Sequence, residues 1–390
     1  METRKKVAII TNNINCERNT QYYSMIEKYF RINNWDICDN FSVDKIIIVG
    51  CGFHDHMYEK VKKAIAETKN SKISEENIII AGCVPKTHES LLEKGFQGKI
   101  VQYHQEALLD EIIAARVKFD HTKYINLFNV HDNSIINKEC FYIKIAEGCL
   151  QQCTFCVIKK VKGLIKSRPV NEIIEQLKLG ISQNYRNFFL MGEDTFAYGH
   201  DTGQSIIELV NSLLKINSNI TLYFGSMHCK WLIKYAEDLL LLCKQGKIKT
   251  LHIGLQHVSN YVLKKMGRGV NFPEVYDIIT NIKKINPDIY LSADILVGFP
   301  GESKEHFNEL VEFFKNDQCF DRISHYGYSD VYGSESFNFA DKIPQIEIGM
   351  RWNYLDKILG ERSGYKNTFK SEKRLIDEND FYFCINTYKQ

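Results

Sequence analysis

Short runs of isoleucine and valine alternate with amphipathic segments in the first 118 residues, and this alternation restricts the fold more than any other feature. The runs, such as KIIIVG, are apolar at nearly every position, whereas the segments between them have helical spacing. Strands that are apolar on both faces are typical of a parallel sheet covered by helices on both sides. We expect strands at residues 7–11, 45–50, 77–82 and 98–103, and helices at residues 16–33, 56–69, 88–95 and 106–117.

The alternation resumes at residue 139. Six further strands are expected at residues 141–146, 187–192, 220–225, 249–255, 289–298 and 322–329, with helices between them such as 170–183, 205–217 and 235–245. About six βα units predict a partial (βα)6 TIM-like barrel, with its chemistry at the carboxyl ends of the strands. The whole chain is then an α/β protein with an N-terminal parallel sheet domain (1–118), a polar linker (119–138), a barrel (139–345), and a C-terminal helix, expected at 347–370, with a short tail (346–390).

Composition narrows the cellular setting and the partners. The formal net charge is +2 and no basic block is visible, so the sequence gives little support for nucleic-acid binding. The N-terminus lacks the long apolar core of a signal peptide, and the longest apolar runs are too short to span a bilayer. We therefore expect a cytoplasmic protein without membrane contact. In that compartment its 12 cysteines indicate metal or redox chemistry rather than disulfides.

Three cysteines are crowded into the stretch EGCLQQCTFC, which follows the first expected barrel strand. Cys149, Cys153 and Cys156 have the spacing C-x3-C-x2-C. Structural zinc sites normally have four ligands, commonly in paired C-x2-C units, and no second pair is present. A 4Fe–4S cluster held by three thiolates leaves one iron free for a substrate or a cofactor. The spacing therefore favours an iron–sulfur cluster with one open iron.

Three more cysteines follow successive strands of the N-terminal sheet. Cys51 and Cys83 each come after a glycine at a strand end, and Cys16 lies a few residues beyond the first strand. In a parallel sheet the strand ends open on one edge, so these three thiols can converge. The alternative is that they are small buried hydrophobic residues. Of the other cysteines, Cys243 is expected in the core, and Cys229 on the active-site edge.

The sequence KIAEGCLQQCTFCVIKKVKGLIKSRP resembles the cluster loop of radical S-adenosylmethionine (SAM) enzymes, and more narrowly that of the methylthiotransferases. The resemblance covers about residues 6–365 and continues in GEDTFAYGHD, LHIGLQHVSNYVLKKMGRG, DILVGFPGESKEHF and YGYSDVYGSESF. The stretch DTFAYG is similar to that of the branch that modifies an aspartate on a ribosomal protein. The family usually has glutamine where this chain has Glu193, and glycine where it has Asn15.

The resemblance implies two 4Fe–4S clusters, with SAM as both radical source and methyl donor. A reductant such as flavodoxin or ferredoxin would supply the electron that cleaves SAM at the first cluster. The second cluster, held by Cys16, Cys51 and Cys83, would carry the sulfur that is methylated and transferred. The residues expected to contact SAM are Gly192, Glu193, Ser226, Gln256, Arg268, Arg168 and Gly298. Glu193 could instead belong to a strand-end turn, Arg168 could cap a helix, and Gly298 could only turn the chain.

The expected activity is insertion of a methylthio group at an unactivated C–H bond of a peptide or protein side chain. The substrate could be a ribosomally made peptide, and aspartate is the first side chain to test. The small C-terminal barrel usual in the family is not expected in the tail after residue 370. Alternatives within enzymes are a tRNA methylthiotransferase with a separate binding partner and a radical SAM methylase or isomerase. A metal-binding protein without catalysis is the alternative from another class.

Overall fold

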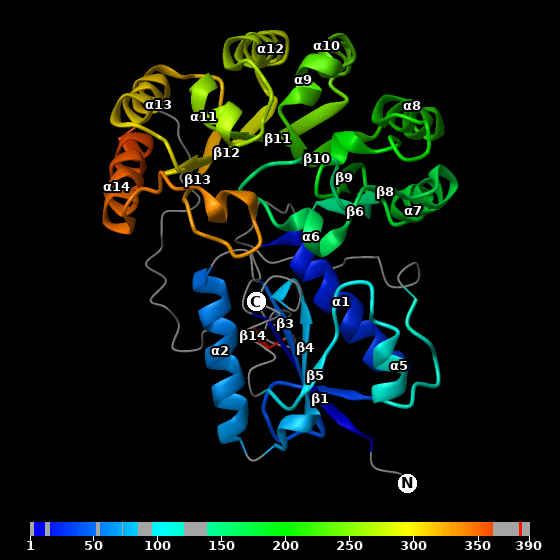
Figure 1. The fold of residues 1–390 in the computed structure, drawn as a ribbon. Coiled ribbons are helices and arrows are strands. Elements are labelled where there is room, and N and C mark those ends of the chain that lie inside the picture. The colour runs from blue at the N-terminus through cyan, green and yellow to red at the C-terminus, as the bar shows by residue number, and fades with distance from the viewer. Residues whose placement is uncertain are drawn as a thin grey trace.

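The computed structural model describes residues 4–11, 16–51, 55–71, 73–84, 96–120, 139–361 and 382–383. These residues form two α/β units, which lie one above the other in Figure 1. The expected helix at 88–95 and the expected linker lie outside the described residues, except for the first two positions of the linker. No helix in the described part of the chain is long and apolar enough to cross a bilayer.

The N-terminal unit is a six-stranded sheet in the order β14-β1-β3-β4-β5, with β2 also paired to β1. All pairs are parallel except β1 with β14. Its strands are β1 (Lys6–Thr11), β2 (Asp36–Cys38), β3 (Lys45–Gly50), β4 (Ile78–Gly82), β5 (Lys99–Ile100) and β14 (Tyr382–Phe383), and its helices are α1 (Glu17–Ile32), α2 (Asp55–Asn70) and α5 (Leu108–Ile112), with a 3-10 turn at Glu75–Asn77. The sequence analysis missed β2.

Successive isoleucines of this sheet enter two different cores. Ile47 and Ile79 pack in a layer with Tyr29 of α1, whereas Ile46 and Ile48 pack in the layer with α2. Because side chains alternate across a strand, a strand covered on both faces must be apolar at every position. The continuous runs read from the sequence therefore have the cause that was expected, and Figure 1 shows helices on both sides of the sheet.

The expected helix at 106–117 was too long, because only α5 is helical there. Ala114 has a φ of +50°, in the left-handed region, so the chain leaves the helix at that point. Asp110 stabilises the turn, since its Oδ1 accepts hydrogen bonds from the backbone N–H of Phe119 at 2.9 Å and from the hydroxyl of Tyr29 at 2.8 Å. A tertiary contact to α1 has overridden the helical pattern.

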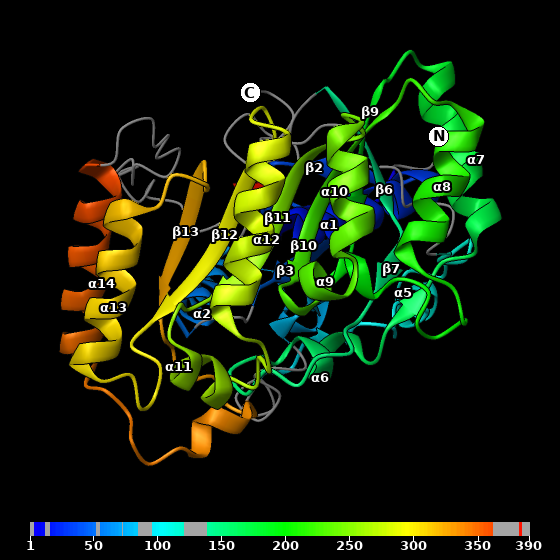
Figure 2. The same cartoon turned by 90° about the horizontal axis from the view of Figure 1, so that it is seen from above.

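The second unit is a six-stranded, all-parallel sheet in the order β13-β12-β11-β10-β9-β6. Its two ends are not paired with each other in the described residues, so it is an open partial barrel, as predicted. Figure 2 shows the strands side by side with helices over their outer face. The strands are β6 (Cys140–Lys144), β9 (Asn187–Met191), β10 (Thr221–His228), β11 (Ile248–Gln256), β12 (Tyr290–Val297) and β13 (Arg322–Gly327).

The helices of this unit follow its strands in sequence and pack over one large apolar core. They are α6 (Ile158–Lys162), α7 (Val170–Ser182), α8 (Ile206–Ile216), α9 (Lys230–Lys234), α10 (Ala236–Lys244), α11 (Asn260–Lys265), α12 (Phe272–Ile285), α13 (Lys304–Asn316) and α14 (Gln345–Glu361), with a small antiparallel pair, β7 (Ala146–Glu147) and β8 (Lys166–Ser167). The helix expected at 235–245 begins at residue 236, directly after α9. We keep the four-segment division of the chain as a proposal.

Candidate active site

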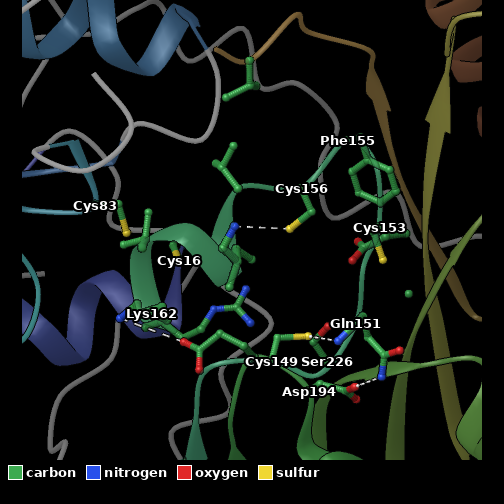
Figure 3. A pocket seen from close by; sticks show the side chains of 18 of the residues that line it. Cys16, Cys83, Cys149, Gln151, Cys153, Phe155, Cys156, Lys162, Asp194 and Ser226 are labelled. Carbon is green, nitrogen blue, oxygen red and sulfur yellow. Dashed lines mark hydrogen bonds and ion pairs between the residues drawn. The ribbon is translucent and has the colours of Figure 1, made fainter. Parts of the chain in front are cut away.

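All six cysteines expected to hold clusters line one cavity of about 470 Å³ between the two units. We call Cys149, Cys153 and Cys156 the loop thiols, and Cys16, Cys51 and Cys83 the sheet thiols. In Figure 3, Cys16 and Cys83 lie on one side of the view and the loop thiols on the other, with α6 between them. The chain thus brings both sets to the same space.

Hydrogen bonds fix the loop that carries the loop thiols. Gly148 has a φ of +80°, and a Cβ there would lie 2.3 Å from the carbonyl oxygen of Leu164, so only glycine fits. The backbone N–H of Gly148 donates to Glu193 Oε2 at 2.9 Å. Further along, Thr154 bonds through its hydroxyl to the carbonyl oxygen of Lys265 at 2.9 Å. The loop is therefore held to β9 and to the end of α11.

Each loop thiol accepts a hydrogen bond from an N–H group. The backbone N–H of Gln151 lies 3.3 Å from Cys149 Sγ, and that of Ile158 lies 3.5 Å from Cys156 Sγ. Arg268 Nη1 lies 3.1 Å from Cys153 Sγ. Donors aimed at sulfur stabilise the thiolate, which is the form that binds metal. Burial raises the pKa of Cys149 and of Cys156 to about 12, so bound cations are needed to deprotonate them.

The sheet thiols meet because of strand register. Gly50 and Gly82 are direct partners in the β3–β4 ladder, so Cys51 and Cys83, one residue further on, lie side by side. Gly82 has a φ of +88°, and a Cβ there would lie 2.8 Å from the carbonyl oxygen of Gly50. Cys16 is the N-cap of α1, where the helix dipole favours a thiolate. The three thiols therefore gather at the carboxyl edge of the sheet.

The donor set fits two clusters better than single metal ions. Among the described residues, no three His, Cys, Asp or Glu side chains are placed to bind one metal ion together. In a 4Fe–4S cluster each thiolate binds a different iron, so the sulfurs do not have to meet at one point. Three thiols at each of two cavity walls match that requirement, and a 4Fe–4S cluster held by either set would keep one iron without a protein ligand.

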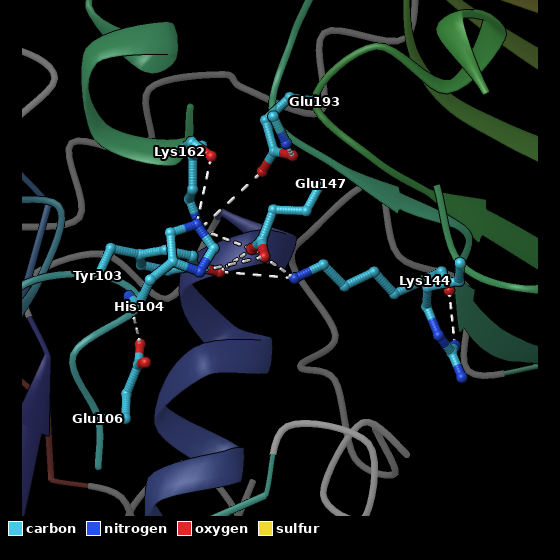
Figure 4. Close-up of polar contacts among 9 residues, drawn as sticks. Tyr103, His104, Glu106, Lys144, Glu147, Lys162 and Glu193 are labelled. Carbon is cyan, nitrogen blue, oxygen red and sulfur yellow. Dashed lines mark hydrogen bonds and ion pairs between the residues drawn. The ribbon is translucent and has the colours of Figure 1, made fainter. Parts of the chain in front are cut away.

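A buried charged network joins the two units beside the thiols (Figure 4). Lys144 Nζ donates to Glu147 Oε1 at 2.6 Å, and the hydroxyl of Tyr103, from the sheet unit, donates to the same oxygen. Lys162 Nζ lies 3.7 Å from Glu147 Oε1, 4.0 Å from Glu193 Oε1 and 3.0 Å from the centre of the Tyr103 ring. The pKa of Glu147 is lowered to about 2, because Lys144 and Lys162 outweigh the opposing effect of its burial. The sequence analysis did not single out this network.

Four of the seven residues expected to contact SAM line the cavity: Glu193, Ser226, Gln256 and Arg268. Gln256 has a φ of +78° at an irregularity in the β11–β12 ladder. Backbone strain of this kind collects at functional sites. Glu193 is 8% exposed, and one of its oxygens is occupied by the loop backbone. Its carboxylate therefore acts first on the position of the loop thiols.

The other three residues, Gly192, Arg168 and Gly298, are not among those that line the cavity. The guanidinium of Arg168 donates to the carbonyl oxygen of Lys144 at 2.7 Å and to Glu172 of α7 at 3.3 Å, so it ties β6 to a helix start. Gly298 has a φ of +78°, and its N–H donates to Glu302 at 2.7 Å. These contacts suit the alternative of a simple turn for Gly298. The helix cap given as the alternative for Arg168 is not formed, because the N-cap of α7 is Pro169 and no side chain caps it. SAM contact at both positions stays a prediction. The carbonyl of Gly192 accepts a hydrogen bond from Arg18 at 3.4 Å.

Asp194 was missed by the sequence analysis, although it begins the quoted stretch DTFAYG. Its carboxylate accepts hydrogen bonds from Gln151 of the thiol loop at 2.7 Å, from the indole of Trp231 at 2.8 Å and from the backbone N–H of His228 at 3.1 Å. One buried carboxylate thus positions the thiol loop, the end of β10 and α9. Cys243 lies in the core as expected, and Cys229 is fully buried against Arg268.

Comparisons with known proteins agree with this geometry. Residues 143–314 match the radical SAM superfamily. The ribosomal protein uS12 methylthiotransferase RimO of Campylobacter jejuni is 30% identical over 89% of this chain and 80% of its own length. The protein of the same name from Nitratiruptor is 29% identical, over 81% of this chain and 73% of its own.

Among solved structures, the radical SAM methyltransferase TsrM from Kitasatospora setae has a TM-score of 0.56 at 12% identity, covering 83% of this chain and 75% of that chain. At that identity the likeness concerns the fold alone. The family assignment comes from the RimO relatives, whose similarity covers 81% and 89% of this chain. The chain belongs to the radical SAM methylthiotransferase family.

Proposed function

We propose that this protein inserts a methylthio group at an unactivated C–H bond of a peptide or protein side chain. The observation that carries the proposal is the single cavity lined by both sets of thiols. A reaction that uses a radical source and a sulfur source on one carbon requires both to face the same space. A cavity of about 470 Å³ lies within the range of small-ligand pockets, roughly 300–1,000 Å³.

When bound, the two clusters and SAM would supply the carbon-centred radical, the sulfur and the methyl group. The chain's own residues hold and orient these groups. The loop thiols, with Glu193 and Asp194 fixing their loop, would hold one cluster at the barrel wall. The sheet thiols would hold the other, opposite the first. Arg268 places a positive charge at Cys153, where a thiolate would form.

The polar lining of the barrel wall suits a substrate side chain. His252 bonds to Asp294 at 2.9 Å and to Ser292 at 2.8 Å, so both of its ring nitrogens are satisfied within the barrel. Gln256 and Tyr326 lie on the same lining. These groups can position a peptide side chain by hydrogen bonds while the reacting carbon stays between the thiol sets.

A protein or peptide substrate is supported by the relatives, whose names state that they modify ribosomal protein uS12. The net charge of +2 gives little attraction to the phosphates of tRNA. Ribosomal protein uS12 and ribosomally made peptides encoded near the gene are the first substrates to test, with aspartate as the first residue. The electron donor would be a small redox protein such as flavodoxin or ferredoxin.

The test is a direct comparison of substrates. Reduced, cluster-loaded protein and SAM are incubated separately with uS12, with candidate peptides and with bulk tRNA, and the products are analysed by mass spectrometry. We expect a methylthio group on a protein or peptide side chain. Methylthiolated nucleosides with unmodified proteins and peptides would contradict the choice of substrate. A product carrying only a methyl group would contradict the sulfur transfer itself.

A further inference from the structure

Tyr22 of α1 lies at the cavity wall that carries the sheet thiols. It lines the cavity together with Asn19 and with Cys16, the N-cap of the same helix, and residues at this spacing share one face of a helix. Tyr22 is only 2% exposed, and Cys83 packs against the apolar core to which the Tyr22 ring belongs. The side chain therefore lies beside two of the three sheet thiols.

The hydroxyl of Tyr22 is held in place without a hydrogen bond. Its ring stacks on that of Tyr103, with the ring centroids 5.1 Å apart and the planes at 28°, and the Tyr103 hydroxyl is itself bonded to Glu147. The hydroxyl oxygen of Tyr22 is buried and has no hydrogen-bond partner in the described part of the chain. Native proteins seldom bury a donor in this way without a reason, because the unmade hydrogen bond is costly.

Two groups that carry negative charge lie near this hydroxyl. Burial raises the pKa of Tyr22 well above its usual value, and the charge of Glu106 and then that of a Cys83 thiolate raise it further, so the hydroxyl keeps its proton. The Glu106 carboxylate accepts a hydrogen bond from the backbone N–H of His104 at 3.2 Å and does not line the cavity. Cys83 does line the cavity, so it is the acceptor on the side where a ligand can bind.

Tyr29 offers a comparison on the same helix. It is fully buried, does not line the cavity, and donates its hydroxyl to Asp110 Oδ1 at 2.8 Å. A tyrosine of α1 that points into the protein has therefore been given a carboxylate as its acceptor. Tyr22, which borders the cavity, has been given none within hydrogen-bond geometry.

We propose that the hydroxyl of Tyr22 donates a hydrogen bond to a sulfur atom of the cluster held by the sheet thiols. In such a cluster the Cys83 sulfur is a thiolate, and hydrogen bonds to the sulfurs are one of the factors that set the reduction potential. Reduction adds negative charge, so a donor binds the reduced cluster more tightly and raises its potential. Tyr22 is therefore a positioning residue that ties this cluster to α1. The inference rests on the second cluster of the proposed function.

The experiment uses the full-length chain with the three loop thiols replaced by alanine, so that any remaining cluster belongs to the sheet thiols. In this parent, Tyr22→Phe removes the hydroxyl but keeps the ring that stacks on Tyr103. Tyr29→Phe is the matched control, because it removes a hydroxyl from the same helix away from the cavity. After anaerobic reconstitution, the midpoint potential is measured by titration with dithionite, followed by absorbance and electron paramagnetic resonance. Iron content and circular dichroism verify loading and fold.

We expect Tyr22→Phe to lower the equilibrium constant for one-electron reduction of the cluster by about tenfold, which is a fall of about 59 mV in the midpoint potential. Tyr29→Phe should leave this constant within about twofold. A second variant, with 3-fluorotyrosine at position 22, keeps the hydroxyl and makes it a stronger donor. The potential should then shift in the opposite direction, which a mere change in packing would not produce.

Unchanged potentials in both variants at position 22, with iron retained, would overturn the proposal and assign the Tyr22 proton to Glu106. Equal shifts in Tyr22→Phe and Tyr29→Phe would also overturn it, because they would reflect the helix rather than the hydroxyl. A parent chain without iron would contradict the second cluster, and with it both the proposed function and this inference. A failure of the Tyr22 contact is therefore distinguishable from a failure of the proposed function.

Discussion

The loop thiols and the sheet thiols face the same cavity but reach it by different means. The loop thiols lie within eight residues, and the short segment that carries them is fixed by hydrogen bonds that it donates to the carboxylates of Glu193 and Asp194. The sheet thiols are far apart in sequence and meet only because parallel strands end at one edge. Local spacing determines the first set, and the topology of a whole domain determines the second.

This difference has a physical consequence for how each site responds to change. The loop is held by contacts to the barrel, so the loop thiols depend on that unit alone. The sheet thiols need β1, β3 and β4 in register, and they also need the two units to stay docked. The charged network around Lys162 contacts both units beside the thiols, so it helps to keep the units docked.

The largest expected effect comes from removing one set of thiols at a time. Two 4Fe–4S clusters hold about eight irons per chain after anaerobic reconstitution. Replacing all three loop thiols by alanine should leave about half of the iron and abolish SAM cleavage. Replacing the three sheet thiols should also leave about half of the iron, yet 5′-deoxyadenosine should still form without methylthiolation. Full iron content in the second variant would refute the second cluster.

The sequence was sufficient for the parts of the site that local chemistry determines. The spacing of the loop thiols predicted three of the cavity thiols. The strand-end positions of Cys51 and Cys83 and the place of Cys16 beyond the first strand predicted the other three, because a parallel sheet has a single carboxyl edge. The βα alternation predicted both sheets. These features depend on residue type and period alone, so they are visible without coordinates.

The sequence was not sufficient where function depends on contacts between distant segments. Lys162 and Tyr103 belong to different units, and nothing in either segment indicates that a cation will lie over a ring. Arg168 sits in a recognisable stretch, yet its guanidinium turns to β6 and α7 rather than to the cavity. Asp194 could have been suspected from its place at a strand end, but its three partners are set by tertiary packing.

The next largest effect should come from Lys162, which connects the two sites. Lys162→Ala leaves Glu147 and Glu193 without this cation in a buried setting, and breaking a buried ion pair costs about 3 kcal/mol. We expect a loss of that size in the free energy of unfolding by urea. Lys160→Ala, at an exposed position on the same helix, should change it by less than about 0.5 kcal/mol. Equal effects of the two substitutions would show that the network does not couple the units.

Lowering the pH should destabilise the barrel more than the sheet unit, and we expect this effect to be smaller than that of Lys162→Ala. Burial lowers the pKa of His257 in the barrel to about 3, whereas an unfolded histidine has a pKa near 6.5. The unfolded barrel therefore binds the proton more tightly. The contribution of His257 to the stability of the barrel is fully present above about pH 6.5. It falls as the pH drops towards 3, by about 1.4 kcal/mol per pH unit. In the sheet unit, by contrast, His104 is exposed.

Tryptophan fluorescence can follow the two units separately in urea at pH 7 and pH 5. Trp35 reports on the sheet unit, and Trp231 and Trp352 report on the barrel. One Trp→Phe variant that retains only Trp35, and another that retains only Trp231 and Trp352, therefore isolate the signal of each unit. We expect the barrel transition to shift to lower urea at pH 5 by more than the sheet transition. A larger shift in the sheet signal would show that other groups dominate the acid response.

The smallest effect is expected at Glu193, and it tests how the loop thiols are positioned. The Glu193 carboxylate accepts from the backbone N–H of Gly148, directly before Cys149, and lies 4.0 Å from Lys162. Glu193→Ala removes the acceptor and frees the loop start, so SAM affinity should fall by about tenfold, the loss of one charge-assisted hydrogen bond.

Glu193→Gln keeps an oxygen that can accept from Gly148 but removes the charge facing Lys162. If the carboxylate acts through the loop, the Gln variant keeps SAM affinity within about twofold, because only an exchange of acceptor has occurred. If it contacts the ammonium group of SAM directly, Gln loses nearly as much as Ala. Equilibrium dialysis with both clusters loaded distinguishes the two cases, and unchanged affinity in the Ala variant would remove Glu193 from SAM binding altogether.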